Sequence, residues 1–223
     1  MLPVNEVFET IQGEATYTGT PSVFIRLQGC DVGCPWCDTK HTWAKNAAHQ
    51  MDQAAMLAKP GDGPAWAQVE VGSLVAIAAN HKARHVVITG GEPCDYDLTE
   101  LTATLLDIGK TVQVETSGTA PVRVAARTWV TVSPKVNMPG GKPLLREALQ
   151  RADELKMPVG KQADIDALQE IISQVAHAHG GRYPVVWLQP LSTSEKATAL
   201  CAKAATLYGW RLSVQTHKYA GLR

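Results

Sequence analysis

The chain has 223 residues, and its 21 Lys and Arg residues balance its 21 Asp and Glu residues. A length of this order suits one compact domain. No basic run interleaved with aromatic residues is present, so we expect a small-molecule ligand and no direct binding of nucleic acid. The sequence lacks a run of about 18 apolar residues and the basic and apolar segments of a signal peptide, so we expect a cytoplasmic protein without a membrane span.

Short β-branched runs alternate with helical patterns along most of the chain. Several of the runs are apolar on both faces, which is typical of buried parallel strands. We predict strands over residues 23–27, 85–89, 111–115, 129–132, 185–189 and 211–215. We predict helices over residues 97–107, 143–155, 164–177 and 194–208.

Repeated β/α units either close into a barrel or open into a doubly wound sheet, and the pattern alone leaves both possible. Both folds place their chemistry at the carboxyl ends of the strands. Unusual residue clusters follow four of the predicted strands, so we expect these clusters to converge in space. They are Gly29-Cys30, Gly90-Gly91-Glu92-Pro93, Glu115-Thr116-Ser117-Gly118 and Ser133-Pro134-Lys135.

The segment 45–71 departs from this repeat. It holds Ala-rich stretches and a turn-forming run from Lys59 to Pro64, with little pattern of the kind that builds a core. We therefore interpret it as a peripheral insertion in a single domain that spans residues 1–223.

Three of the five cysteines, Cys30, Cys34 and Cys37, lie within eight consecutive residues. This spacing indicates metal ligation under reducing conditions rather than a disulfide framework. Thiolates suit both iron–sulfur clusters and zinc, and three ligands would leave one iron of a [4Fe-4S] cluster open. The alternative is a zinc site in which His41 supplies the fourth ligand. We assign no metal to Cys94 or to Cys201, which lies in a predicted helix as a small buried hydrophobic residue.

The motif Cys30-x3-Cys34-x-Trp36-Cys37 resembles the signature of the radical S-adenosylmethionine (SAM) superfamily. The Gly90 to Pro93 run looks like the second signature of that superfamily, where glycine leaves room for the methionine amino group. Nearly the whole chain resembles the 7-carboxy-7-deazaguanine synthase family. The matching segments are 5–14, 24–30, 37–39, 115–119, 132–135, 188–190 and 213–219.

The resemblance implies an α/β fold, a partial (β/α)6-type TIM barrel whose [4Fe-4S] loop spans residues 30–37. It implies that SAM chelates the open iron and yields a 5'-deoxyadenosyl radical, with the cofactor carrying the difficult chemistry. The radical takes hydrogen from C6 of 6-carboxy-5,6,7,8-tetrahydropterin, and ring contraction with loss of ammonia gives 7-carboxy-7-deazaguanine for queuosine biosynthesis. The further implied partners are Mg²⁺, a flavodoxin or ferredoxin as electron donor, and a second copy of the chain in a homodimer.

The resemblance also assigns roles to single residues. Thr39 would bind Mg²⁺, which prefers oxygen ligands. The cofactor residues would be Gly91, Glu115, Ser133, Lys135 and Gln189. The substrate residues would be Ile11, Gln12, Gly13, Glu14, Arg26, Thr89 and His217.

Simpler roles stay open for several of these residues. Arg26 could offer a bidentate fork to a substrate carboxylate, or it could form a surface salt bridge. Glu115 and Lys135 could instead form an ion pair at the barrel mouth, and His217 could be a structural histidine. Some family members end in a proline whose carboxylate reaches the substrate, whereas this chain ends in Arg223.

Two other functions remain possible from the sequence. One is an activase that forms a glycyl radical on a partner protein, because such chains are short and carry the same cysteine and glycine signatures. The other is a non-catalytic zinc or interaction module, in which the segment 45–71 would serve as a docking surface.

Overall fold

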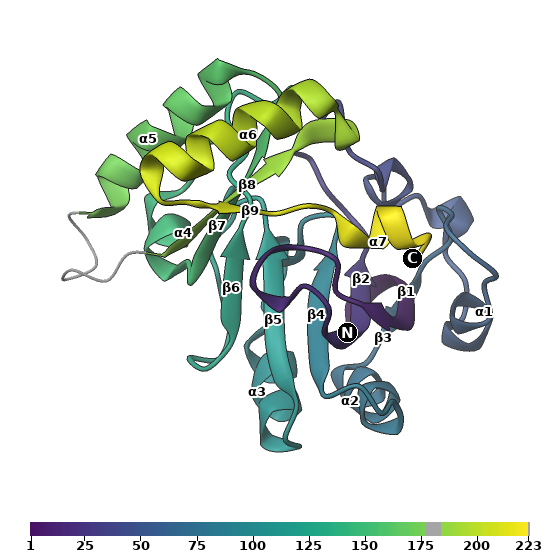
Figure 1. The fold of residues 1–223 in the computed structure, drawn as a ribbon. Coiled ribbons are helices and arrows are strands. Elements are labelled where there is room, and N and C mark those ends of the chain that lie inside the picture. The colour runs from purple at the N-terminus through teal and green to yellow at the C-terminus, as the bar shows by residue number, and fades with distance from the viewer. Residues whose placement is uncertain (177–183, 223) are drawn as a thin grey trace.

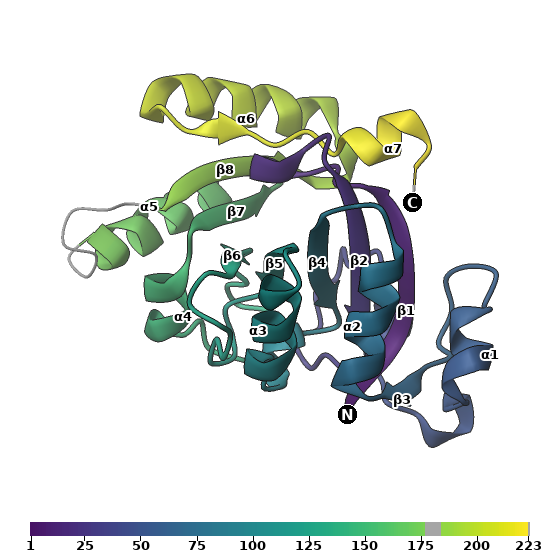
Figure 2. The ribbon, with the colours of Figure 1, turned by 90° about the horizontal axis from the view of Figure 1, so that it is seen from below.

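The computed structural model describes residues 1–176 and 184–222. Its strands form one nine-stranded sheet in the order β3-β1-β2-β4-β5-β6-β7-β8-β9. From β2 to β9 neighbouring strands run parallel, whereas β1 is antiparallel to both β2 and β3. The sheet curves around an interior without its two edges pairing (Figures 1 and 2). The predicted α/β partial barrel is therefore confirmed.

The strands are β1 (Leu2–Ile11), β2 (Pro21–Leu27), β3 (Ala67–Val69), β4 (His85–Gly90), β5 (Thr111–Thr116), β6 (Trp129–Val132), β7 (Glu154–Val159), β8 (Val185–Pro190) and β9 (Arg211–Leu212). The α-helices are α1 (Gln53–Leu57), α2 (Val71–Asn80), α3 (Thr99–Asp107), α4 (Arg146–Arg151), α5 (Gln162–Ala176), α6 (Glu195–Tyr208) and α7 (Thr216–Ala220). Five predicted strands and the helices over α3, α5 and α6 are confirmed. His177, the last residue of the predicted 164–177 helix, lies outside the described residues.

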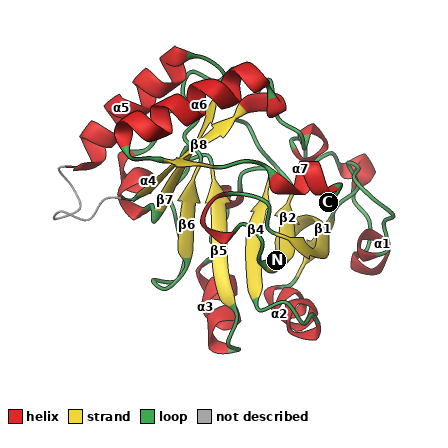
Figure 3. Ribbon diagram, in the orientation of Figure 1, coloured by secondary structure: helices red, strands yellow, loops and turns green. Residues whose placement is uncertain are grey.

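The helices cover the outer face of the curved sheet (Figure 3). α3 packs against β5, α5 against β7 and α6 against β8. The β-branched and leucine side chains of the strands are buried against these helices, as in Val23, Ile25 and Leu27 of β2. Cys201 is fully buried in α6, as expected of a small hydrophobic residue. No helix in the described ranges is long and apolar enough to cross a membrane.

The predicted helix over 143–155 is wrong, because this stretch holds the short α4 and the start of β7. Asp153 separates the two elements: its carboxylate accepts a hydrogen bond from Val130 N at 2.8 Å, and its carbonyl accepts one from Val185 N at 3.0 Å. β7 is buried along almost its whole length, so it has no alternating pattern that would reveal a strand.

The last predicted strand, 211–215, is also too long, since β9 contains only Arg211 and Leu212. The chain leaves the ladder at Ser213, whose hydroxyl accepts a hydrogen bond from Ala15 N at 3.0 Å and donates one to Gln189 Oε1 at 3.2 Å. Tertiary contacts therefore replace strand pairing here. The sequence analysis did not predict β1 or α2.

The segment 45–71 lies at the β1 edge of the sheet (Figure 2) and contributes to the core. Met56, Trp66 and Val69 are buried, so the interpretation that this segment builds little core is wrong. The reason is β3, which pairs with the unpredicted β1. Lys59 anchors the loop by donating to the Asn5 carbonyl at 3.0 Å and to Asn5 Oδ1 at 2.9 Å.

Candidate active site

A cavity of about 510 Å³ lies at the carboxyl ends of the parallel strands. The four residue clusters that follow the predicted strands all contribute to it, so their predicted convergence is confirmed. The cavity also contains every residue to which the family resemblance gave a metal, cofactor or substrate role. These are Ile11, Gln12, Gly13, Glu14, Arg26, Cys30, Cys34, Cys37, Thr39, Thr89, Gly91, Glu115, Ser133, Lys135, Gln189 and His217.

The cysteine loop is held by its own backbone and by Trp43. Cys30 N donates to the Trp43 carbonyl at 3.0 Å, and the Trp43 indole donates to Cys37 Sγ at 3.4 Å. All three cysteines are free thiols, and burial raises the pKa of Cys30 to about 11. Three soft sulfur donors therefore face one cavity.

His41 does not join the three thiols at the cavity, and its buried Nε2 has no hydrogen-bond partner among the described residues. Within the part of the chain that the structure describes, no set of three His, Cys, Asp or Glu side chains is gathered tightly enough to hold a metal ion. A zinc ion needs its ligands to converge at about 2.0–2.3 Å. The zinc site with His41, which the sequence left open, is therefore not formed by this geometry.

The glycine turn after β4 is pressed against the end of β2. Gly91 N donates to the Leu27 carbonyl at 2.9 Å, and a Cβ atom added to Gly91 would lie 2.0 Å from the Gly29 carbonyl oxygen. Gly90 has a φ of +127°, which disfavours any residue with a side chain. Glycine is therefore needed here because the ends of β2 and β4 touch. This reason adds to the one from the sequence, in which glycine leaves room for a ligand.

Glu92 completes this turn, although the sequence analysis gave it no role of its own. The side chain is buried and its carboxylate accepts hydrogen bonds from Cys94 N at 2.9 Å, Thr116 Oγ1 at 2.6 Å and Ser117 N at 2.8 Å, and also from the Ser117 hydroxyl. Glu92 therefore joins the end of β4 to the end of β5.

Arg26 projects from β2 into the cavity and is no surface residue. Its Nε donates to Glu6 Oε1 at 2.7 Å, and its guanidinium lies 5.7 Å from the centre of the Phe8 ring. The side chains of Arg26 and Glu6 are only 17% and 5% exposed. The salt bridge that the sequence left open is real, but it lies inside the cavity wall and orients Arg26 toward the cavity.

A second part of the cavity wall, which we call the opposite wall, holds a buried ion cluster of Glu14, Glu115 and Lys156, the last of which is on β7. Lys156 Nζ donates to Glu115 Oε2 at 2.9 Å and to a carboxylate oxygen of Glu14. Gln215 donates to the other oxygen of Glu14 at 2.7 Å, and Gln12 donates to Glu115 Oε1 at 3.0 Å. Each carboxylate is therefore held by one cation and at least one amide.

Charges in this cluster stabilise each other. Burial disfavours the charged form of Lys156, but the two neighbouring carboxylates outweigh it and raise the lysine pKa above its ordinary value. Burial likewise opposes ionisation of Glu14, yet Lys156 lowers the pKa of that carboxyl to about 2. Glu14 therefore stays negatively charged next to a positive lysine at neutral pH.

The alternative in which Glu115 pairs with Lys135 is wrong, because Lys156 takes that place. Lys135 instead donates to Ser133 Oγ at 2.6 Å and to the Ser133 carbonyl at 3.0 Å. Burial lowers the pKa of Lys135. Its ammonium group is thus held at the mouth of β6 by a hydroxyl and a carbonyl oxygen.

The C-terminal helix α7 lies beside the loop that follows β1 and contributes His217 and Lys218 to the lining of the cavity. Thr216 N donates to the Gly13 carbonyl at 3.0 Å. A Cβ atom added to Gly13 would lie 2.2 Å from His217 Nδ1, so only glycine allows the histidine this close. Leu222 also lines the cavity, whereas Arg223, whose contact with substrate the sequence left in doubt, lies outside the described residues.

Known proteins with similar sequences identify this arrangement. Residues 24–134, which hold the thiol loop and the glycine turn, match the radical SAM superfamily. The 7-carboxy-7-deazaguanine synthase of Escherichia coli K12 is 48% identical over 99% of this chain and 98% of its own length. The enzyme of that name from Buchnera aphidicola subsp. Schizaphis graminum is 43% identical over 99% of both chains. This chain belongs to the 7-carboxy-7-deazaguanine synthase family.

The fold of the family extends over the whole described structure. The crystal structure of QueE from Escherichia coli superposes with a TM-score of 0.91 at 47% sequence identity, covering 96% of this chain and 93% of that one. The family resemblance that the sequence analysis identified is therefore confirmed.

Within this family site, Lys156 is the main residue that the sequence analysis missed. The strand Glu154–Val159 is mostly apolar but contains this one lysine. Lysine is an unusual residue at a buried position. The wrong helix over 143–155 ended one residue before Lys156 and so concealed this signal. Gln215 lay in a recognised segment, but only the structure pairs it with Glu14.

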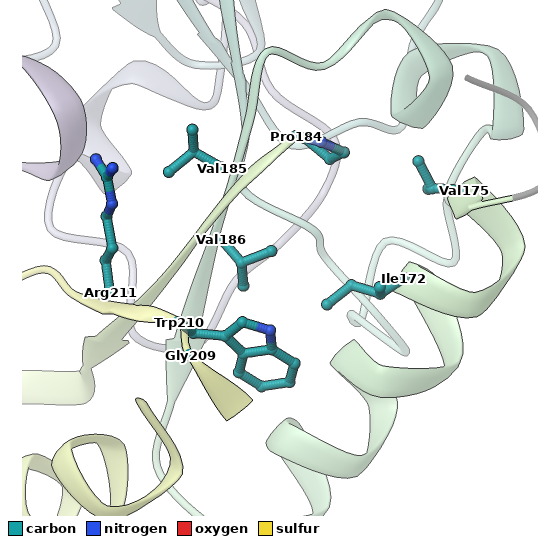
Figure 4. A pocket seen from close by; sticks show the side chains of 8 residues that line it. All are labelled: Ile172, Val175, Pro184, Val185, Val186, Gly209, Trp210 and Arg211. Atoms are coloured by element: carbon teal, nitrogen blue, oxygen red, sulfur yellow. The ribbon is translucent and has the colours of Figure 1, made fainter. Parts of the chain in front are cut away.

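A second cavity, of about 340 Å³, lies between α5, β8 and the turn before β9 (Figure 4). Figure 4 shows the Trp210 ring facing Ile172 and Val186, whereas Arg211 points away from it. Among the described residues that line this cavity Arg211 alone is charged, and its guanidinium lies 5.3 Å from the centre of the Trp187 ring. The first cavity therefore holds the residues that can support catalysis.

Proposed function

We propose that this chain converts 6-carboxy-5,6,7,8-tetrahydropterin to 7-carboxy-7-deazaguanine, with ring contraction and loss of ammonia, in queuosine biosynthesis. One observation carries the proposal: the three-thiol loop, the glycine turn and the ion cluster of Glu14, Lys156 and Glu115 line the same cavity. The names of the family relatives agree with this chemistry.

The donor set of the cysteine loop fits a [4Fe-4S] cluster. In such a cluster each thiolate binds a different iron, so the three sulfurs need not converge on one point as they would around zinc. When bound and reduced, the cluster and SAM together supply a 5'-deoxyadenosyl radical. The thiol loop holds the cluster, and the Cys30, Cys34 and Cys37 side chains must lose their protons to do so.

The cavity residues that the family resemblance assigns to the cofactor would bind SAM. Lys135 offers a positive charge to the methionine carboxylate, and its hydrogen bonds to Ser133 fix its position. Gly91 presents a backbone that no side chain covers. Glu115 and Gln189, at the ends of β5 and β8, supply oxygen acceptors for the adenosyl part.

A second set of cavity residues would bind the pterin. Arg26, oriented by Glu6, faces the cavity as the partner for the substrate carboxylate. The segment from Ile11 to Glu14 and His217 would contact the ring edge, where unmatched polar groups penalise other heterocycles. Thr89, at the end of β4, would complete this side.

Mg²⁺ would bind near Thr39, between the cysteine loop and the substrate. Asp38 and Asp62 line the same part of the cavity wall, and carboxylate and hydroxyl oxygens are the ligands that Mg²⁺ prefers. We also propose a flavodoxin or ferredoxin as the electron donor and a homodimer as the assembled form.

The activity is tested by incubating the anaerobically reconstituted protein with the pterin, SAM, Mg²⁺ and a reductant, and by following products with mass spectrometry. We expect 7-carboxy-7-deazaguanine and ammonia in equal amounts, with SAM regenerated. A protein that contains the cluster and cleaves SAM but forms no deazaguanine would reject the proposed function. Omitting Mg²⁺ should lower the rate if Thr39 and its neighbours bind it.

A further inference from the structure

Lys156 joins two parts of the cavity that are far apart in sequence. Glu14 lies 142 residues before it and Glu115 lies 41 residues before it, yet the lysine ammonium donates to both. Glu14 belongs to the segment assigned to the substrate. Glu115 lies near the carboxyl end of β5 and is assigned to the cofactor. The lysine therefore spans the boundary between the two proposed ligand sites.

The geometry around Lys156 leaves it little freedom. The side chain is only 5% exposed, and Gln215 and Gln12 hold the far oxygens of the two carboxylates. A buried ammonium group must keep its charged partners, because a lone buried charge is costly. The positions of Glu14 and Glu115 relative to each other are thus fixed through one atom, Lys156 Nζ.

Neutralising other buried charges does not explain this lysine. Glu154, two residues earlier on β7, is fully buried but accepts hydrogen bonds from the hydroxyls of Thr131 at 2.7 Å and Thr16 at 2.5 Å. Lys156 instead lines the cavity, where Glu154 does not. Within the part of the chain that the structure describes, the hydrogen bonds of Lys156 go to the two cavity carboxylates.

We infer that Lys156 is a positioning residue that sets the distance between the substrate segment 11–14 and the cofactor-binding end of β5. This inference rests on the proposed function. Hydrogen transfer between two bound molecules depends steeply on the distance between the reacting atoms, so a lysine that fixes their two binding segments controls how efficiently the radical reaches the substrate.

Two substitutions separate the charge of Lys156 from its geometry. Lys156→Met removes the charge, whereas Lys156→Arg keeps the charge but places it on a longer, planar group. Lys110→Met is the matched control, because Lys110 donates to the carbonyls of His81 at 2.9 Å and Ala83 at 2.7 Å outside the cavity. Each variant is purified anaerobically with its cluster and checked for iron content and SAM binding.

Two quantities are then measured. The first is the dissociation constant of the pterin for each variant with the cluster left oxidised, so that no turnover occurs. The second is the amount of 5'-deoxyadenosine released per deazaguanine formed during turnover. Release of 5'-deoxyadenosine without product reports a radical that failed to reach the substrate.

We expect both Lys156 variants to release more 5'-deoxyadenosine per product and to bind the pterin more weakly than the wild type. We expect kcat/KM to fall on the order of 100-fold, the loss that a misplacement of about 1 Å can cause. Lys110→Met should keep the wild-type ratio of products and the wild-type pterin affinity.

Three results would overturn the inference. Wild-type values of both quantities in Lys156→Arg would mean that the charge alone matters. A wild-type ratio of 5'-deoxyadenosine to product in both Lys156 variants would mean that the lysine does not control how the radical reaches the substrate. Loss of the cluster from both variants would give the lysine a role in folding only. A wild-type protein that forms no deazaguanine would instead reject the proposed function.

Discussion

The two walls of the cavity are built in different ways. The cysteine wall depends on backbone geometry within short stretches, where the Gly90-Gly91 turn touches the end of β2 and Trp43 holds the loop. The opposite wall depends on side chains from distant segments, since Glu14 meets Lys156 across 142 residues and Gln215 across 201. One wall is a set of local motifs, and the other exists only in the folded chain.

This difference predicts what a substitution will damage. Changes in the cysteine wall should remove the cofactor or strain the backbone. Changes in the opposite wall should leave the [4Fe-4S] cluster in place while disturbing the charge balance of the cavity and the position of the substrate.

The largest effect should come from the cysteine loop. Cys34→Ser replaces a buried soft ligand by a hard hydroxyl, so we expect the reconstituted protein to lose its cluster and all detectable product formation. Iron and sulfide per chain measure this directly. Cys201→Ala is the control, because that thiol is buried in α6 away from the cavity. Full iron content in Cys34→Ser would contradict the assignment.

The opposite wall should respond through stability and its pH dependence. Lys156→Met leaves Glu14 and Glu115 without their cation, which we expect to lower the free energy of unfolding by about 3–5 kcal/mol at neutral pH. Lys156 lowers the pKa of Glu14 from 4.5 to about 2, so its stabilising effect is complete above pH 4.5 and is lost as the pH falls toward 2.

Chemical denaturation of the wild type and Lys156→Met across this range measures the difference. The deficit of the variant should be largest near neutral pH and should shrink steadily below pH 4.5. A deficit that is the same at every pH would show that lost packing, and not the ion cluster, causes the destabilisation.

A smaller effect is expected from the glycine turn. Gly91→Ala forces a Cβ atom toward the Gly29 carbonyl oxygen, so we expect a loss of about 1–3 kcal/mol together with lower activity. Gly72→Ala in α2 is the matched control, because apart from its chain neighbours and the α2 backbone no atom of the described residues lies within 4 Å of the added Cβ, and it should be neutral or slightly stabilising. Thermal unfolding of both variants compares them, and equal stability would refute the close packing.

The smallest effect concerns His85, which lies behind the opposite wall. Its Nε2 is 3.0 Å from Gln113 Oε1, and burial lowers its pKa below 6.5. The folded protein therefore resists protonation of this ring, so stability should fall as the pH drops below 6.5, by at most about 1.4 kcal/mol per pH unit. His85→Gln should reduce this slope, which denaturation at pH 7.5 and 5.5 measures. An unchanged slope would assign it to other groups.

The difference between the walls also explains what the sequence could predict. The thiol spacing and the Gly90 to Pro93 run are local patterns, so the cysteine wall was predicted from neighbouring residues. Five of the parallel strands, β2, β4, β5, β6 and β8, were predicted for the same reason, because each is a short apolar run between helical patterns.

Long-range contacts account for most of what the sequence could not predict. Lys156 gains its meaning from Glu14 and Glu115, neither of which is near it in the chain. β1 and β3 were missed because β3, which lies inside the segment 45–71, pairs with a strand at the start of the chain. The pairing of Arg26 with Glu6 likewise depends on the antiparallel register of β1 and β2, in which these two residues are directly opposite.

The central claim is that three thiols hold a cluster whose open iron binds SAM in this cavity. The most direct test is the electron paramagnetic resonance spectrum of the reduced, anaerobically reconstituted protein with and without SAM. We predict the signal of one reduced [4Fe-4S] cluster per chain, with g values that shift when SAM is added. A protein without such a cluster, or a spectrum that SAM leaves unchanged, would contradict this account.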